Sequence, residues 1–180
     1  MRTRRSAWNV TKTILFLLVV WGIVVIALPL GVSVLEVEAG IQRFPEQVWA
    51  SVVLLPLSTL LSIWSAMTLA VKGRGTPMPF DPPSRLVIAG PYAYLRHPFA
   101  AAVTAQVVGL GVALGSIPVI GYAAVIFTAW YFLVRNREER ALVTRFGGAT
   151  RAYATHVRAF RPRLTPYRGG NENGPAPPSS

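Results

Sequence analysis

The sequence predicts an all-α fold, a polytopic membrane helix bundle with about four transmembrane helices. Two observations support this prediction. Hydrophobic residues make up 52% of the 180-residue chain and charged residues only 14%, proportions that a soluble domain of this size seldom has. Charged residues are also completely absent from three long runs, which are Ile14–Leu35, Val48–Val71 and Pro98–Val134.

The lengths of these runs set the number of spans. A helix needs about 20 apolar residues to cross the hydrocarbon core of a bilayer. The first two runs therefore supply one span each. The first follows a basic N-terminus but is longer than the apolar region of a signal peptide, so we interpret it as a retained span. The third run is too long for one span and predicts a tight helical hairpin with its turn at Gly115–Pro118.

The positions of the basic residues predict the orientation. Lys and Arg concentrate in the cytoplasmic segments of membrane proteins. With four spans, all of them except Arg43 fall on one side of the membrane, together with both termini. We therefore expect cytoplasmic N- and C-termini and a location in the cell (inner or plasma) membrane. The net charge of +11 then reflects this rule and contact with anionic membrane lipids, and no nucleic-acid partner is expected.

Three segments outside the spans have distinct characters. The proline-rich loop 72–96 is expected to be ordered, mostly extended and laid over the membrane face. Apolar residues at helical spacing between arginines predict a C-terminal interfacial amphipathic helix over residues 135–163, interrupted near Gly147-Gly148. The predicted units are an N-terminal tail with two scaffold helices (1–71), a core of loop, hairpin and amphipathic helix (72–168), and a disordered tail (169–180).

Polar chemistry is concentrated at the two open ends of the predicted hairpin. Arg96-His97-Pro98 precedes the third span, and Arg135, Glu138 and Glu139 follow the fourth. Because a hairpin brings its open ends together, we expect a cation, an imidazole and a carboxylate to face one another there. Adjacent helical residues point in different directions, so only one of the two glutamates is expected to reach a shared pocket.

Residue types alone favour a purely structural explanation, in which the arginines snorkel and pair with the glutamates. No metal site is expected, because His156 is the only other histidine and no third ligand is apparent. The chain has no cysteine, which excludes thiolate chemistry. Ser-His-Asp catalysis is unsupported too, since Asp81 is the only aspartate and no G-x-S-x-G motif occurs.

A longer pattern spans residues 73–163. It reads G-x-G-T-P-x-P-F-x-P-P-x-x-L-V-x-x-G-P-Y-x-x-x-R-H-P and, after the hairpin, E-E-x-x-L-x-x-x-F-G and Y-x-x-x-V. This pattern resembles the isoprenylcysteine carboxyl methyltransferase and phospholipid methyltransferase family. These are integral membrane enzymes that transfer a methyl group from S-adenosyl-L-methionine.

The resemblance implies roles for particular residues. Glu139 is the better candidate of the two glutamates for holding the cofactor. Arg135 is implied for the methyl acceptor, and it would position the reactants together with Arg96 and His97. The residues implied for the cofactor are Leu86, Val87, Tyr92, His97, Pro98, Glu138 and Glu139.

The chain departs from the family pattern at four positions. Ala100 and Ala102 stand where the family commonly has Tyr and Gly, Thr150 where it often has Tyr, and Arg158 where it has Pro. Loss of the first tyrosine removes a hydroxyl and a ring from the pocket. We therefore expect cofactor affinity or acceptor choice to differ from the family norm.

The expected activity is methyl transfer to a lipophilic acceptor at the cytoplasmic face. Transfer from a sulfonium is an in-line displacement that depends on positioning and partial dehydration more than on acid–base power. An isoprenylcysteine-type carboxylate, a phospholipid amine, a small thiol and a lipophilic hydroxyl all remain open as acceptors. The excess of Arg over Lys is typical of a GC-rich bacterial genome, which makes a prenylated protein a less expected substrate.

Two alternatives come from other functional classes. An NAD(P)H-dependent membrane reductase could share a related C-terminal architecture, but such enzymes have more spans. A non-catalytic small membrane protein is the other alternative. Small multidrug transporters carry a glutamate in mid-span, and none of the predicted spans contains one.

Overall fold

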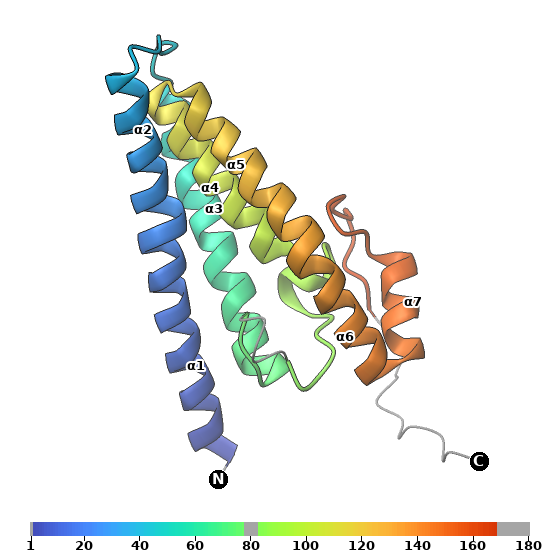
Figure 1. The fold of residues 1–180 in the computed structure, drawn as a ribbon. Helices are drawn as coiled ribbons and strands as arrows, with labels where there is room; N and C mark the ends of the chain where they lie inside the picture. Colours follow the sequence, from blue (N-terminus) through green and yellow to red (C-terminus); the bar gives the residue numbers. More distant parts are fainter. Residues whose placement is uncertain (1, 78–82, 169–180) are drawn as a thin grey trace, which may run out of the picture.

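A computed structural model describes residues 2–77 and 83–168, so the tail predicted to be disordered lies outside the described residues. Over these residues the chain is helical and contains no strand, which confirms the predicted all-α fold (Figure 1). The helices are α1 (Arg2–Val19), η1 (Val20–Ala27), α2 (Leu28–Glu38), α3 (Val48–Thr68), η2 (Leu69–Gly73), η3 (Gly90–Ala93), α4 (Pro98–Leu114), α5 (Ile117–Trp130), η4 (Tyr131–Arg135), α6 (Asn136–Phe146) and α7 (Gly148–His156).

Three continuous helices have the length and composition to cross a membrane: Ala7–Glu38, Val48–Gly73 and Ile117–Phe146. The first continues without a break through the π-helical segment η1 and the third through η4, whereas the second ends in the π-helical segment η2. The apolar helix α4 has 17 residues, the lower end of the ~17–25 that a span needs. The chain is therefore a helical membrane protein, as its hydropathy predicts.

Helix α4 occupies the interior of the bundle, packed between α3 and α5 (Figure 1). Val107 of α4 and Val119 of α5 are completely buried in the hydrophobic core. On the α3 side, Gln106 donates from Nε2 to Thr59 Oγ1 at 2.9 Å. Buried serines of α3, including Ser62, let the two helices approach closely, because small side chains keep backbones near each other.

The turn between α4 and α5 lies where the sequence predicts it. Gly115 ends α4 with φ +63°, and a Cβ atom there would collide with the carbonyl oxygen of Phe44. The Phe44 amide in turn donates to the Gly115 carbonyl at 3.0 Å. Ser116 begins α5 by accepting the amide of Val119 on its Oγ. The first loop of the protein is thus fastened to this hairpin turn.

Arg43 secures the same loop from its other side. Its Nε lies 3.2 Å from Glu36 Oε2, and its Nη2 donates to Ser33 Oγ at 2.6 Å. This end of the bundle therefore has one internally satisfied arginine, while the other basic residues lie elsewhere along the chain.

The C-terminal part differs from the expectation in where its amphipathic helix begins. Helix α6 continues α5 through η4, because no proline or glycine stands between Trp130 and Phe146 to end the helix. The break comes at Gly147, with φ +53° and ψ −121°, close to the predicted interruption. Helix α7 then folds back along α6 (Figure 1). Thr150 fixes this arrangement by donating from Oγ1 to the Leu142 carbonyl at 3.0 Å.

Candidate functional site

The site lies at the end of the bundle away from the Arg43 loop, where the start of α4 meets α6 and α7. Residues 157–168, which we name the strap, return from α7 across the segment that precedes α4. The Arg96 amide donates to the Arg158 carbonyl at 3.1 Å, and the Tyr167 amide donates to the Ala93 carbonyl at 2.9 Å. Residues far apart in the sequence are therefore held together here by backbone hydrogen bonds.

His97 is positioned by the start of α4. It is the residue just before the helix, and Pro98 takes the first helical position, where a missing N–H costs nothing. The imidazole is 9% exposed. Its Nε2 lies 3.1 Å from Glu139 Oε1, and its Nδ1 lies 3.7 Å from Glu138 Oε2.

Both glutamates therefore approach His97, but only Glu139 lines the cavity described below, in agreement with the expectation that one of the two would reach a shared pocket. The two imidazole nitrogens lie on different edges of the ring, so adjacent residues that leave α6 in different directions can each approach one nitrogen. Only the Glu139 contact has hydrogen-bond length, and the Glu138 contact is too long to be one.

Burial lowers the pKa of His97 from its ordinary value, and the positive charges of Arg96 and Arg135 act in the same direction. The hydrogen bond to Glu139 and the charge of this carboxylate oppose burial without overcoming it. The imidazole is therefore neutral near neutral pH. Because a carboxylate only accepts hydrogen bonds, the single ring proton belongs on Nε2, which leaves Nδ1 bare toward Glu138.

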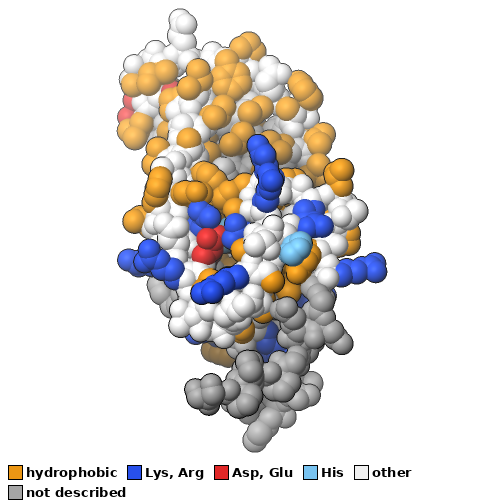
Figure 2. Space-filling view, turned by 90° about the vertical axis from the view of Figure 1, so that its right-hand side faces the viewer, with side chains coloured by type: hydrophobic (Ala, Val, Ile, Leu, Met, Phe, Trp, Pro, Cys, Tyr) orange, Lys and Arg blue, Asp and Glu red, His pale blue; other side chains and the backbone are white. Residues whose placement is uncertain are grey.

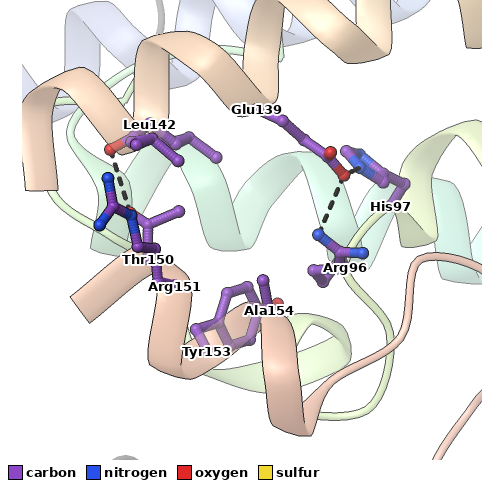
Figure 3. A pocket seen from close by; sticks show the side chains of 9 residues that line it. Arg96, His97, Glu139, Leu142, Thr150, Arg151, Tyr153 and Ala154 are labelled. Carbon is purple, nitrogen blue, oxygen red and sulfur yellow. Dashed lines mark hydrogen bonds and ion pairs between the residues drawn. The ribbon is translucent and has the colours of Figure 1, made fainter. Parts of the chain in front are cut away.

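The Glu139 carboxylate accepts hydrogen bonds from several side chains of the site (Figure 3). Its Oε1 accepts from Arg96 Nη1 at 3.0 Å and from Arg135 Nε at 3.2 Å, in addition to its contact with His97. Arg135 Nη2 also donates to Oε2 at 3.2 Å, so this pair is bidentate. Charge-assisted bonds of this kind are about twice as strong as neutral ones and fix geometry as well.

A cavity of about 120 Å³ opens beside this cluster, between α6, α7 and the residues ahead of α4 (Figure 3). Its wall is partly charged and partly apolar. Arg151 is exposed and forms no ion pair or hydrogen bond with the described part of the chain. The lining residues are Arg96, His97, Glu139, Leu142, Val143, Thr150, Arg151, Tyr153 and Ala154.

The site residues predicted from the sequence do not include several residues of this lining, among them Leu142 of α6 and Arg151, Tyr153 and Ala154 of α7. Tyr153 belongs to the Y-x-x-x-V motif, and Leu142 to the E-E-x-x-L motif, in which it lies one helical turn after the glutamates on the same face. These two positions could have been proposed from spacing. Arg151 and Ala154 carried no signal, because their place depends on how α7 folds back at Gly147.

Tyr92 lies behind the cavity. It belongs to η3 and is buried, and its carbonyl accepts the Tyr153 hydroxyl at 2.6 Å. Burial raises the pKa of Tyr92 well above its ordinary value, with a further contribution from the charge of Glu138, so the phenol stays protonated. Tyr92 thus connects the proline-rich loop to α7.

Leu86, Val87 and Pro98 do not line the cavity. Pro98 is buried at the start of α4. Val87 packs against Gly73, where an added Cβ would meet Val87 Cγ2 at 2.9 Å. Leu86 is half-buried beside it. The structure therefore brings Arg96, His97, Arg135, Glu138 and Glu139 into one cluster and leaves the Leu-Val pair in the neighbouring loop.

These features define a class of protein. It is a helical membrane protein whose charged pocket lies beside an apolar helix long enough to cross a membrane. The sequence profile of the family described as phospholipid methyltransferase matches residues 47–149, more than half of the chain. The chain belongs to this family of membrane methyltransferases. No curated protein and no solved structure matches it.

The family match confirms the resemblance read from the motifs. It begins just before α3 and ends at the start of α7, so it includes the whole Arg96–Glu139 cluster. The long helix of α1, η1 and α2 lies outside the matched segment, as does the strap.

Proposed function

We propose that this protein transfers a methyl group from S-adenosyl-L-methionine to a lipophilic acceptor that arrives from the bilayer. The observation that carries the proposal is the Glu139 cluster on the wall of a cavity, in a chain that belongs to a methyltransferase family. Bound there, the cofactor would supply an electrophilic sulfonium methyl group. The protein would bind it, orient it and exclude water.

The residues of the cavity suit the chemistry of this cofactor. Carboxylate oxygens of Glu139 can accept ribose hydroxyls or an ammonium group, and the exposed guanidinium of Arg151 can bind a carboxylate. Leu142, Val143 and Ala154 provide an apolar surface for a purine ring. The cavity wall therefore combines a negative group, a positive group and an apolar surface. This combination matches a ligand that carries both charges and an aromatic ring.

The size of the cavity implies movement on binding. Pockets for nucleoside-sized ligands usually hold about 300 Å³ or more, which exceeds the roughly 120 Å³ present here. We infer that α7 separates from α6 when the cofactor enters. The bond from Thr150 to the Leu142 carbonyl, which holds the two helices together, would open in that step.

The orientation in the membrane is part of the proposal. Lys and Arg gather around the end of the molecule that carries the site, below a surface dominated by hydrophobic side chains (Figure 2). The positive-inside rule supports a cytoplasmic location for this end. A cytoplasmic pocket would meet a cytosolic cofactor, while the acceptor would approach along α5.

Binding of radiolabelled S-adenosyl-L-methionine to the detergent-purified protein tests the proposal. We expect saturable binding by the wild type and a loss of about tenfold or more in affinity for Glu139→Gln, which keeps the shape but removes the charge. Glu46→Gln, at an exposed position in the Arg43 loop, is the matched control and should bind normally.

Two results would contradict the proposal. Absence of binding by the wild type would overturn it, and so would equal binding by the wild type and Glu139→Gln. A parallel titration with NADPH distinguishes the reductase alternative, because saturable binding of NADPH without binding of the methyl donor would favour that class instead.

A further inference from the structure

The strap places one aromatic ring, that of Phe160, against the membrane helix beside the site. Its centroid lies 5.0 Å from the Phe127 ring and 6.0 Å from the Trp130 ring, both in edge-on contacts. It is 6.3 Å from the Tyr131 ring. It also stacks on His97, with 5.9 Å between centroids and 27° between planes. We name these four aromatic residues, Phe127, Trp130, Tyr131 and Phe160, the aromatic wall.

The aromatic wall stands between His97 and the lipid-facing side of α5. Phe127, Trp130 and Tyr131 belong to the long apolar helix Ile117–Phe146. The three rings are half-buried, whereas Val125 and Leu133, on the opposite face of the same helix, are 66% and 63% exposed, as expected for side chains that meet lipid. The wall therefore covers the side of His97 that is turned toward α5, where Trp130 and Phe160 contact the imidazole ring.

His97 divides the site into two halves. The carboxylates of Glu138 and Glu139 approach the edges of its ring, where the nitrogens are. Phe160 covers a face of the same ring, and Trp130 meets it edge-on at 5.1 Å. The cavity lies on the side of His97 that faces Glu139. The aromatic wall covers the other side of His97.

Phe160 is the part of the wall that is not built on a helix. The backbone hydrogen bonds that fasten the strap flank it, one at the Arg158 carbonyl and one from the Arg163 amide to the Tyr94 carbonyl. Between these anchors the ring is held by aromatic contacts, which are individually weak. The position of the Phe160 ring therefore depends on these aromatic contacts and not on a helix of its own.

We propose that Phe160 is a specificity-determining residue that limits the width of the acceptor reaching His97 and Glu139. The inference rests on the proposed function, since it concerns the acceptor side of the same site. A slim single-chain acceptor displaces the ring only slightly, whereas a two-chain lipid must displace it fully. The residue lies after the family-matched segment, which covers residues 47–149.

The test compares two acceptors with purified protein in nanodiscs. N-acetyl-S-farnesylcysteine provides a single chain, and dioleoylphosphatidylethanolamine provides two. The ratio of kcat/KM for the two-chain lipid to that for the single-chain probe is measured with labelled S-adenosyl-L-methionine. We expect Phe160→Ala to raise this ratio by about tenfold, the scale on which steric changes alter specificity. Affinity for the methyl donor should not change.

Two further variants serve as a control and as a graded substitution. Leu164→Ala alters a fully exposed side chain on the same strap and should leave the ratio unchanged. Phe160→Leu retains apolar bulk without a flat ring and should raise the ratio by less than Phe160→Ala. If the alanine variant does not fold, the leucine variant alone decides the outcome.

The failure of this inference is distinct from failure of the proposed function. An unchanged ratio in the Phe160 variants overturns the role of Phe160. The role of Phe160 is also overturned if the protein binds the methyl donor but neither the wild type nor any variant methylates either acceptor. In both of these outcomes donor binding is preserved, so the proposed binding of the methyl donor still stands. Absence of donor binding by the wild type overturns the proposed function and the inference together.

Discussion

Individual side chains at the site are arranged around a neutral histidine and the Glu139 carboxylate, which accepts more hydrogen bonds on Oε1 than on Oε2. Glu139 accepts from Arg96, His97 and Arg135, so its negative charge is compensated. Among the residues that the structure describes, the Glu138 carboxylate has one polar contact, with His97 Nδ1 at 3.7 Å. This carboxylate is therefore the less satisfied of the two, and it does not line the cavity.

The protonation state of His97 is a prediction at this scale. Because burial penalises the charged imidazolium, the pKa of His97 lies below its ordinary value, and protonation requires a lower pH than in an unfolded chain. In ¹⁵N-histidine NMR spectra at pH 6.5 to 7, near the ordinary pKa of about 6.5, the ring should be neutral with its proton on Nε2. Comparison with His97→Gln assigns the signals. A ring half-protonated above its ordinary pKa would contradict this placement.

The sequence predicted the membership of this cluster well and its geometry less well. The hairpin topology alone was enough to bring Arg96 and His97 near Glu139. The double approach to His97 could not be predicted, because it depends on the backbone of the residue before α4, with φ −123° and ψ 58°. These angles aim the imidazole between two neighbouring positions of α6.

At the scale of elements, the α4–α5 hairpin positions the site, and its turn depends on one glycine. Gly115 adopts φ +63° and leaves no space for a Cβ beside the Phe44 carbonyl. Gly121, one turn into α5, has open space around its Cβ position. The same substitution at these two positions therefore has opposite consequences.

Gly115→Ala should lower the free energy of unfolding by about 1–3 kcal/mol, the range for backbone strain of this kind. Gly121→Ala should be neutral or stabilise by up to about 1 kcal/mol, because alanine favours the helix. Thermal unfolding in detergent measures both. Equal destabilisation by the two substitutions would show that the Phe44 contact does not constrain the turn.

The element that sequence reasoning described least accurately is the C-terminal helix pair. The alternation of apolar residues and arginines predicted an amphipathic helix after the last span, and the glycine pair predicted a break. The pattern contained no signal that α6 would continue α5 directly. The spacing of apolar residues predicts which face of a helix is apolar, but it does not predict the residue at which the helix begins. The return of α7 onto α6 follows from the unusual backbone of Gly147 and the Thr150 bond, and it creates the cavity.

For the whole molecule, hydropathy and charge placement were sufficient to predict a helical membrane bundle. Both patterns are determined by the lipid and water around the helices, and they do not depend on individual side-chain contacts. The long helix Ala7–Glu38 lies outside the family-matched segment and contacts the bundle along α3 and α5. We interpret it as a scaffold for the hairpin. The predicted division of the chain at residue 72 stays a prediction, and the family-matched segment begins earlier, at residue 47, so that it includes α3.

The orientation can be tested with single cysteines, because the natural chain has none. Gln42→Cys lies in the exposed loop near Arg43, and Thr165→Cys lies on the exposed part of the strap. In intact cells, a membrane-impermeant maleimide should label the first variant. It should label the second only after the membrane is opened. The reverse pattern would place the pocket on the extracytoplasmic side and contradict the proposed access to a cytosolic cofactor.

Methyl transfer by the purified protein can be measured directly as incorporation of label into lipid. Purified protein in nanodiscs containing a total bacterial lipid extract is incubated with methyl-labelled S-adenosyl-L-methionine, and label in the organic phase is followed over time. We predict incorporation that depends on protein concentration, falls by about tenfold or more in Glu139→Gln and persists in Glu46→Gln. Label that stays in the aqueous phase, or incorporation that is equal in the wild type and Glu139→Gln, would contradict the proposed function.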